Sequence, residues 1–490
     1  MMLALTMLLA ATVAAEAAPA KARPARTPAG LRTRVERALA RAQQHEGLKH
    51  ALWAIEVRSA ATGKAVYSRH PDLSVMPASS LKLATTAAAL DAFGPDARFS
   101  TTVQSAARPN ATGVLAGDVY LVGSGDPSLS RELAARPEHG VFEILAQALQ
   151  DAGVRRIEGK VLGVDGAFLG ERRGADWSWE DLVWWYGAEV SALSFNDNCA
   201  DLTVTAGERA GDPVRVGREP ASAFYRVVSS ATTSAAGTPP ALTLTRAPGS
   251  NEVRLSGTYP IGAETWEGSA ALEDPARYAA TVFGEVLAAR GIVVSGPVET
   301  SSVPLPAGVR VLAAHESPPL LEILKAVNKT SQNLHAEMML RLLGARRRGA
   351  GSADAGREAA AEFLRRVGVE PSAWAMQDGS GLSRSDVLTP HEMVSLLAAM
   401  DRHPRAAAFR ETLPIAGRDG TLKNRMKGGA ADGRVVAKTG TLRQVNALAG
   451  YVTARGGSRL AFVAIANHHT AGGSAATTAL DEIGALLASF

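Results

Sequence analysis

The chain has 490 residues, which is too long for one ordinary hydrophobic core and predicts two or three domains. Its content of 46% hydrophobic and 20% charged residues is typical of a soluble globular protein, and its net charge of +4 comes without the basic cluster that nucleic-acid binding requires. Cys199 is the single cysteine, which excludes an internal disulfide, cysteine-based zinc sites and iron–sulfur clusters.

Residues 1–18 are predicted to be a signal peptide. Leu3 to Ala15 is almost wholly apolar but too short to span a bilayer, and Ala15-Glu16-Ala17 resembles a signal-peptidase site. A positively charged start is missing, so a disordered Ala-rich tail is the alternative. Residues 19–30 are expected to form a flexible lead-in. These features favour export to the periplasm or cell-wall space, in soluble or peripherally membrane-associated form.

Residues 31–97 are predicted to form the first part of an α/β domain. The apolar stripe of 31–42 indicates a helix, and 51–57 with 65–67 indicates a strand hairpin. A second helix is expected to start at Ser79 and to end at Gly94-Pro95.

Residues 98–305 differ from the flanking regions in their pattern of short β-rich pieces, which predicts one or two inserted β-rich domains. Gly, Pro and Asn separate short β-rich pieces, which are 99–103, 118–122, 202–205, 214–216, 241–245 and 253–256. Helices are expected at 141–152 and 276–290. The second of these has Asp274 as its N-cap, Pro275 at its first position and Gly291 past its end.

Residues 306–490 are predicted to complete the first domain. The expected helices are 320–327, 334–343, 358–367 and 390–400, and the expected strands are 435–437, 447–452 and 460–466. A last helix carries Leu480, Ile483, Leu487 and Phe490 on one face. Strands and helices at both ends of the chain imply one α/β domain that the insert splits.

Ser79 and Lys82 are the first candidate catalytic pair. Residues three apart share a helix face, so the lysine amine would reach the serine hydroxyl. A deprotonated lysine can then activate the hydroxyl as a nucleophile. This S-x-x-K pattern is common by chance, but it is also the first motif of the active-site serine penicillin-recognising enzymes.

Two further motifs of such enzymes follow in order. Ser331-Gln332-Asn333 lies between two predicted helices, whereas the competing Ser194-Phe195-Asn196 lies in the insert. Lys438-Thr439-Gly440, followed by Thr441, is expected to end the strand at 434–437, where a strand edge can pair with a peptide substrate. A lysine and hydroxyls at this place suit a terminal carboxylate.

With these motifs in this order, the chain resembles the class C low-molecular-mass penicillin-binding proteins, the D-alanyl-D-alanine carboxypeptidase/endopeptidase family. The long insert is itself typical of that family, and S-x-x-K β-lactamases are shorter and lack it. The middle residue of the second motif is commonly Asp in the family, and Gln332 departs from this. Further matching segments are Gly123-Ser124-Gly125-Asp126-Pro127, Asp378-Gly379-Ser380-Gly381-Leu382-Ser383, Asp419-Gly420-Thr421-Leu422 and Lys438-Thr439-Gly440-Thr441-Leu442.

The resemblance implies a fold and a reaction. The fold is a split serine transpeptidase/β-lactamase-like α/β (α+β) domain, with an antiparallel sheet flanked by helices, and inserted β-rich domains. The reaction is acyl transfer on peptidoglycan stem peptides, with β-lactam antibiotics as covalent inhibitors and with no cofactor or metal. Carboxypeptidase and endopeptidase activities stay open, as do the third stem-peptide residue and the oligomeric state.

The resemblance also implies residue roles. Ser79 would be the nucleophile and Lys82 its base, with a pKa that repulsion from Lys438 lowers. Ser331 would pass the proton to the leaving amine, and Asn333 would orient Lys82 and the substrate amide. The other roles are an oxyanion hole at the N–H groups of Ser79 and Thr441, and a carboxylate site at Lys438, Thr439, Gly440 and Thr441.

Several other sequence patterns resemble functional motifs but are better interpreted as structural features. Gly379-Ser380-Gly381 lacks nucleophile-elbow spacing and indicates a turn, and His391-Glu392 fails as a zincin motif because position 395 is Ser. His468-His469 indicates a solvated loop. The tryptophans at 177, 179, 184 and 185 could contact a ligand, but packing is the preferred interpretation. The alternative functions are a β-lactamase- or esterase-like hydrolase on the same fold, and a catalytically weak cell-wall binding protein.

Overall fold

The computed structural model describes residues 27–130, 133, 139–371, 374–472 and 474–490. The predicted signal peptide and most of the predicted lead-in lie outside these residues. Helix α1 spans Pro28–Ala42 and therefore begins inside the lead-in predicted for 19–30. The Thr27 side chain caps it by accepting a hydrogen bond from the Gly30 N–H, and proline is well tolerated in a first helical turn.

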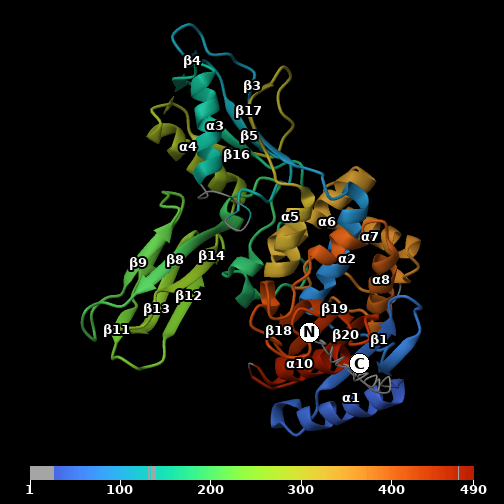
Figure 1. Cartoon of the computed structure of the whole chain (residues 1–490). Helices are drawn as coiled ribbons and strands as arrows, with labels where there is room; N and C mark the ends of the chain where they lie inside the picture. Colours follow the sequence, from blue (N-terminus) through green and yellow to red (C-terminus); the bar gives the residue numbers. More distant parts are fainter. Residues whose placement is uncertain (1–26, 131–132, 134–138, 372–373, 473) are drawn as a thin grey trace, which may run out of the picture.

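The central sheet is antiparallel and joins both ends of the chain. Its strand order is β18-β19-β20-β1-β2, so that β1 pairs with β20 along its whole length. Figure 1 shows this as blue strands beside red ones. The predicted fold class, an antiparallel sheet flanked by helices, is confirmed. The strands are β1 (Leu52–Ser59), β2 (Ala65–Arg69), β18 (Val435–Leu442), β19 (Val445–Thr453) and β20 (Arg459–Asn467).

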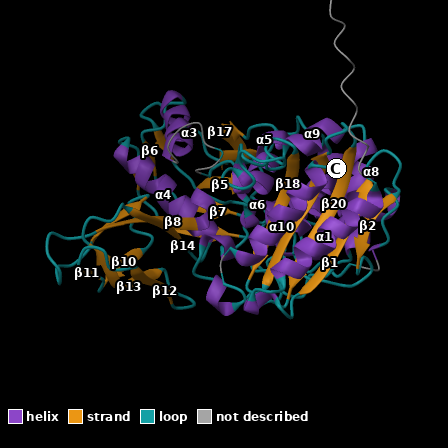
Figure 2. Cartoon of the chain, turned by 60° about the horizontal axis from the view of Figure 1, so that its bottom comes forward, coloured by secondary structure: helices purple, strands orange, loops and turns teal. Residues whose placement is uncertain are grey.

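The two faces of this sheet pack against different helices because side chains alternate along a strand. Trp53, Ile55 and Val57 of β1 face a core that α1 and α10 (Ala475–Ala488) cover. Ala54 lies on the opposite face, in the larger core of the helical layer. Figure 2 shows α1 and α10 lying across the strands.

The helical layer on the second face carries much of the site. Helix α2 (Lys82–Phe93) is almost entirely buried in it, and α5 (Leu320–Lys325) runs into a π-helical turn at Ala326–Thr330 instead of continuing to residue 327 as an α-helix. A π turn of this kind is frequent at functional sites. The other helices are α6 (Asn333–Arg348), α7 (Ala353–Arg366), α8 (Pro390–Arg402) and α9 (Ala406–Glu411).

The insert contains a mixed sheet with helices packed on it, and two smaller sheets. The mixed sheet has the order β16-β7-β5-β3-β17, and α3 (His139–Asp151) and α4 (Pro275–Ala289) share its core. Its strands are β3 (Ser100–Ser105), β5 (Val119–Gly123), β7 (Val161–Val164), β16 (Val298–Ser301) and β17 (Arg310–Glu316). Because β17 pairs with β3, this sheet extends beyond residue 305, where the insert was predicted to end. Three short strands, β4 (Val114–Leu115), β6 (Arg156–Ile157) and β15 (Val293–Val294), pair beside it.

The smaller sheets extend away from the catalytic part, on the left of Figure 1. One has the order β14-β8-β9, and the other consists of β10, β13 and β11, with β12 also paired to β13. Their strands are β8 (Cys199–Thr205), β9 (Arg215–Glu219), β10 (Arg226–Ser229), β11 (Thr232–Ser234), β12 (Ala241–Arg246), β13 (Glu252–Pro260) and β14 (Trp266–Ala271).

The N-cap prediction for α4 needs a correction. Asp274 occupies the N-cap position, but its φ is 60° and its side chain makes no capping hydrogen bond. Arg172 donates instead to the Asp274 carboxylate, at 3.3 Å. Asp274 is therefore at the predicted N-cap position, but its carboxylate binds Arg172 and not the helix N–H groups.

Candidate active site

Ser79 lies in a 3-10 turn, η2 (Ala78–Leu81), immediately before α2 and not on the α-helix itself. Ala78 has a φ of 47°, which is strained for alanine and must be held by its surroundings. Two glycines allow neighbouring backbone to pack closely against Pro77 and Ala78. A Cβ on Gly381 would lie 2.0 Å from the Ala78 carbonyl oxygen, and a Cβ on Gly440 would lie 2.7 Å from that of Pro77.

Lys82 is fully buried, and its Nζ lies within hydrogen-bond distance of three oxygens. These are Ser79 Oγ at 2.9 Å, Asn333 Oδ1 at 2.6 Å and the Ser380 carbonyl at 2.7 Å. Sequence reasoning therefore placed Lys82 beside Ser79 correctly, and the structure brings Asn333 to the same amine.

Burial lowers the pKa of Lys82 to about 7, because the charged form loses its hydration. Asp378, Glu337 and Asp386 oppose this by raising the same pKa. The predicted cause, repulsion from Lys438, was therefore wrong, since desolvation by burial is the largest effect. The Lys438 pKa lies well below its usual range, through burial first and then through the charge of Lys82.

Ser331 and Lys438 form a second pair: Ser331 shares a pocket with Ser79, and Lys438 is buried beside it. Lys438 Nζ donates to Ser331 Oγ at 2.8 Å and to the Thr439 carbonyl at 2.8 Å. Ser331 follows the π turn with a φ of 68°, which directs the chain into α6. The competing Ser194 is buried in the insert, where its hydroxyl donates to the Ser191 carbonyl.

The Lys438-Thr439-Gly440-Thr441 segment lies within β18, which corrects the prediction that it ends the strand. The strand stands at the edge of the sheet. On the side away from β19, the Ala437 N–H donates to the Pro414 carbonyl. Backbone groups of alternate residues point to the same side, so the N–H groups of Thr439 and Thr441 point to this open edge. Thr439 Oγ1 is also hydrogen-bonded to Thr421 Oγ1, at 2.8 Å.

The loop around Ser380 is held by a buried aspartate that sequence reasoning had read only as part of a family segment. Asp378 accepts hydrogen bonds from the N–H groups of Ser380, Gly381 and Ser383. Trp177 of the insert donates to the same carboxylate, at 2.8 Å. Asp378 thereby fixes the Ser380 carbonyl that contacts Lys82.

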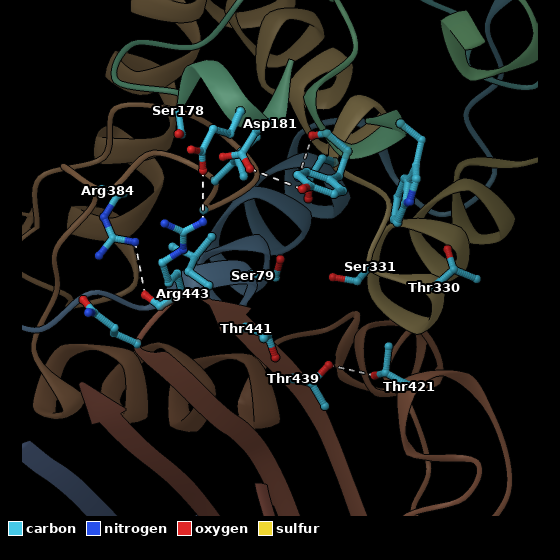
Figure 3. Close-up of a pocket in the computed structure, with 18 residues that line it drawn as sticks. Ser79, Ser178, Asp181, Thr330, Ser331, Arg384, Thr421, Thr439, Thr441 and Arg443 are labelled. Atoms are coloured by element: carbon cyan, nitrogen blue, oxygen red, sulfur yellow. Dashed lines mark hydrogen bonds and ion pairs between the residues drawn. The ribbon is translucent and has the colours of Figure 1, made fainter. Parts of the chain in front are cut away.

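The active-site pocket has a volume of about 790 Å³, and both parts of the molecule line it. Figure 3 shows Ser79 and Ser331 pointing into the same space, with Thr439 and Thr441 on the neighbouring strand. Asn333 Nδ2 donates to the backbone carbonyl of Tyr186 in the insert, at 2.8 Å. The insert therefore contacts a motif residue directly.

Charged side chains form the rim of this pocket. Arg443 pairs with Glu180 at 3.0 Å, and Arg384 donates to the Arg443 carbonyl. Tyr186 donates to Asp181 at 3.2 Å. Sequence reasoning missed these rim residues. The tryptophan-rich segment at 177–185 was the only signal that this part of the insert reaches the site.

The remaining sequence candidates lie elsewhere. His391 contacts Arg58, and His469 is buried behind β20, so the prediction of solvated loop histidines was wrong for His469. Within the described residues, no group of three or more His, Cys, Asp or Glu side chains is placed to hold a metal ion. No helix in the described part of the chain has the length and apolarity to cross a bilayer.

The sequence model of the D-Ala-D-Ala carboxypeptidase 3 (S13) family matches residues 35–487. The chain belongs to this family. It is 36% identical over 455 residues to the D-alanyl-D-alanine carboxypeptidase of Actinomadura sp. strain R39, covering 90% of this chain and 82% of that protein. It is 28% identical over 405 residues to D-alanyl-D-alanine carboxypeptidase DacB of Haemophilus influenzae, covering 81% of each chain.

A solved structure of a penicillin-binding protein has the same overall fold. The crystal structure of penicillin-binding protein 4 (dacB) from Haemophilus influenzae superposes with a TM-score of 0.78 at 25% identity. The match covers 91% of this chain and 97% of that chain, so it includes the insert. The resemblance inferred from the motifs is therefore confirmed.

Proposed function

We propose that this chain is a serine-type D-Ala-D-Ala carboxypeptidase that cleaves peptidoglycan stem peptides through an acyl-enzyme on Ser79. The observation that carries the proposal is the contact of Lys82 Nζ with Ser79 Oγ, at 2.9 Å in a buried setting. Membership of the S13 family and the D-alanyl-D-alanine carboxypeptidase names of its relatives support it.

The three contacts of Lys82 suit a neutral amine. A neutral amine has two N–H donors and one lone pair. The two donors match Asn333 Oδ1 and the Ser380 carbonyl, which leaves the lone pair facing the Ser79 hydroxyl. With a pKa of about 7, a substantial share of Lys82 is neutral near neutral pH. Lys82 is thus the base that takes the proton when Ser79 Oγ attacks the carbonyl between two D-alanines.

The open edge of β18 supplies the place for the substrate backbone. The N–H of Thr441 points to this edge and, together with the N–H of Ser79, stabilises the negative charge that develops on the attacked carbonyl oxygen. Thr439 offers a second backbone N–H on the same side. A peptide pairing here extends the sheet by one strand.

Lys438 and Ser331 act on the D-alanine that leaves when the peptide bond breaks. The hydroxyls of Thr439 and Thr441 line the pocket and bind the terminal carboxylate of the substrate, and the buried Lys438 amine reaches the pocket through its hydrogen bond to Ser331. Ser331, hydrogen-bonded to Lys438, relays the proton from Lys82 to the leaving D-alanine amine when the peptide bond breaks. Water then attacks the Ser79 ester, which releases the shortened peptide and restores the hydroxyl.

We infer that the protein works outside the cytoplasmic membrane, because peptidoglycan lies there and residues 3–15 form an apolar segment of export type. Fractionation of cells that express the full chain tests this. Recovery of the intact, uncleaved chain in the cytoplasm would contradict it.

The decisive experiment is intact-mass analysis after incubation with penicillin, for the wild-type protein and for Ser79→Ala. We expect a mass increase of one drug molecule in the wild type alone, and release of D-alanine from a stem pentapeptide by the wild type alone. Rapid turnover of penicillin without a lasting adduct would favour a β-lactamase-like hydrolase. Neither adduct nor turnover would favour a binding protein and overturn the proposal.

A further inference from the structure

Glu337 is a buried carboxylate near the active site that the proposed mechanism does not yet use. Its side chain is 1% exposed and lies on α6, one helical turn after Asn333. Arg341 follows one turn later on the same face, with a side chain that is 2% exposed. Because Asn333 contacts Lys82, these three residues form a line along α6 that begins at the candidate base.

Glu337 holds the loop that contacts Lys82. Its Oε1 accepts a hydrogen bond from the Gly379 N–H at 2.8 Å, and the Gly379 carbonyl accepts one from Thr85 of α2 at 2.7 Å. A Cβ on Gly379 would lie 2.9 Å from a backbone carbonyl of α6, so the loop lies directly on this helix. The next carbonyl along the chain, that of Ser380, accepts from Lys82 Nζ. Gly379 is therefore fixed between α6 and α2, one residue before the contact with the base.

Arg341 joins Glu337 to the insert. Its Nη1 lies 3.4 Å from Glu337 Oε2, and its Nη2 donates to the Glu171 carbonyl of the insert at 2.8 Å. Trp177 of the insert supports the same loop through Asp378. The insert therefore reaches the loop beside the candidate base by two routes, and Glu337 lies on one of them.

Charged groups from several elements surround Glu337. They are Lys82 on α2, Arg341 on α6, Arg357 on α7, Asp378 and Asp386 between α7 and α8, and Lys438 on β18 beyond Lys82. Burial first, and then the charge of Asp378, raise the pKa of Glu337 to about 7, against the opposite effect of Arg341. Glu337 is therefore negatively charged above about pH 7, where Lys82 is neutral and can act as a base.

The charge of Glu337 is the feature that needs an explanation. A glutamine at this position would offer the same kind of acceptor to the Gly379 N–H. A buried carboxylate loses its hydration, and a buried ion pair is often no more stable than a neutral replacement. The position of the charge supplies a reason, because Glu337 raises the pKa of Lys82 and so favours its protonated form.

We propose that Glu337 is a positioning residue for acylation, which holds the Ser380 carbonyl against Lys82 and stabilises the ammonium that this lysine becomes. As Ser79 Oγ bonds to the substrate carbonyl carbon, its proton moves to Lys82 Nζ. The ammonium then has three N–H donors, which match Asn333 Oδ1, the Ser380 carbonyl and Ser79 Oγ. The fixed negative charge of Glu337 offsets the positive charge that forms in this buried place. This proposal rests on the proposed function.

The test measures the rate of penicillin acylation against pH for three variants. Glu337→Gln keeps an acceptor for the Gly379 N–H and removes the charge, whereas Glu337→Asp keeps the charge on a side chain that is one methylene shorter. Glu362→Gln on α7 is the matched control, because the Glu362 side chain is 54% exposed. Circular dichroism and the Tm check that each variant is folded.

We expect Glu337→Gln to move the midpoint of the pH dependence to lower pH by about one unit, because the Lys82 pKa falls when a nearby negative charge is removed. Its maximal rate should fall about threefold, since a weaker base takes the proton less readily. Glu337→Asp should lower the rate about tenfold, the size of a lost hydrogen bond to a charged group, and leave the midpoint near that of the wild type. Glu362→Gln should match the wild type in both.

Several outcomes would overturn the proposal. One is a midpoint for Glu337→Gln that stays in place or moves to higher pH. Another is an equal midpoint shift in Glu337→Gln and Glu337→Asp, because the shift would then come from a displaced loop and not from the charge. If Glu337→Gln does not fold, an unaltered acylation rate in Glu337→Asp would still overturn it. Absence of any penicillin adduct in the wild type would instead count against the proposed function.

Discussion

The catalytic part and the insert contribute different kinds of groups to one pocket. The catalytic part provides side-chain hydroxyls and amines in two hydrogen-bonded pairs, Ser79 with Lys82 and Ser331 with Lys438. The insert places Glu180 and Asp181 on the rim, and it supports the catalytic part through the Tyr186 carbonyl, which Asn333 contacts, and the Trp177 indole, which donates to Asp378. The candidate catalytic side chains therefore come from the motifs, whereas the groups of the insert that contact them lie outside the motifs.

Substitution of the candidate nucleophile, Ser79, is the sharpest test of this difference between the catalytic part and the insert. Ser79→Ala should lower kcat/KM by about 10⁴-fold or more, because no other described hydroxyl contacts Lys82 Nζ. Circular dichroism and the Tm should be unchanged, since the hydroxyl is half-exposed and replaces no core contact. If this variant still released D-alanine, the nucleophile would not be Ser79 in η2.

The base gives the next largest effect and a pH dependence. Protonated Lys82 has no lone pair, so acylation requires the neutral amine, and its pKa is about 7. The rate of penicillin acylation should rise with pH, reach half of its maximum near pH 7, and be about one tenth of the maximum at pH 6. Lys82→Met should lower the rate by about 10³-fold and abolish this dependence. A pH-independent rate in the wild type would argue against Lys82 as the base.

Trp177 tests whether the insert supports the chemistry. Its indole donates to Asp378, which holds the Ser380 carbonyl against Lys82. Trp177→Phe removes this one donor and should lower the acylation rate about tenfold, the size of a lost hydrogen bond to a charged group. The midpoint of the pH dependence should also shift, which a purely structural role would not produce.

Trp179→Phe is the matched control, because Trp179 is 70% exposed and lies in the same segment. It should leave both the rate and the pH midpoint unchanged. Equal effects of the two variants would mean that the segment acts through general stability and not through Asp378.

The sequence indicated the candidate catalytic residues, which the structure brings together, because the predicted chemistry restricts the residue types. The predicted chemistry needs a hydroxyl and an amine three residues apart, which Ser79 and Lys82 provide, and a lysine amine on an edge strand, which Lys438 provides. Position 186, by contrast, supplies only its carbonyl oxygen, which any residue has. The indole of Trp177 was visible in the sequence, but its partner Asp378 lies 201 residues away.

The strands were predicted well where the apolar run is long, and less well where the local signal is short. β19 and β20 are almost fully buried on both faces and gave clear apolar runs. The strand end at 437 was misplaced, because Lys438 and Gly440 interrupt the apolar run while the backbone continues as β18. The cause of the low Lys82 pKa was missed for a related reason, since burial depends on distant elements such as α6.

Removing the rim ion pair, which joins the catalytic part to the insert, should have the smallest effect of these changes. Arg443 and Glu180 link the catalytic part to the insert at 3.0 Å, but their side chains are 78% and 70% exposed. Exposed pairs contribute about 0–1 kcal/mol, because water screens the charges and the long side chains lose freedom on pairing. Glu180→Gln should therefore change the free energy of unfolding by less than about 0.5 kcal/mol, as measured by urea denaturation.

The variant for comparison is Asn333→Leu, which removes the partly buried hydrogen bond to the Tyr186 carbonyl and the buried one from Lys82 Nζ, and leaves that carbonyl unpaired. This should cost about 1–3 kcal/mol, more than the rim pair, because an orphaned polar group keeps its full desolvation penalty. A larger loss from Glu180→Gln than from Asn333→Leu would reverse this order. The insert would then be held by its charged rim, and the contact of Asn333 with the insert would serve catalysis alone.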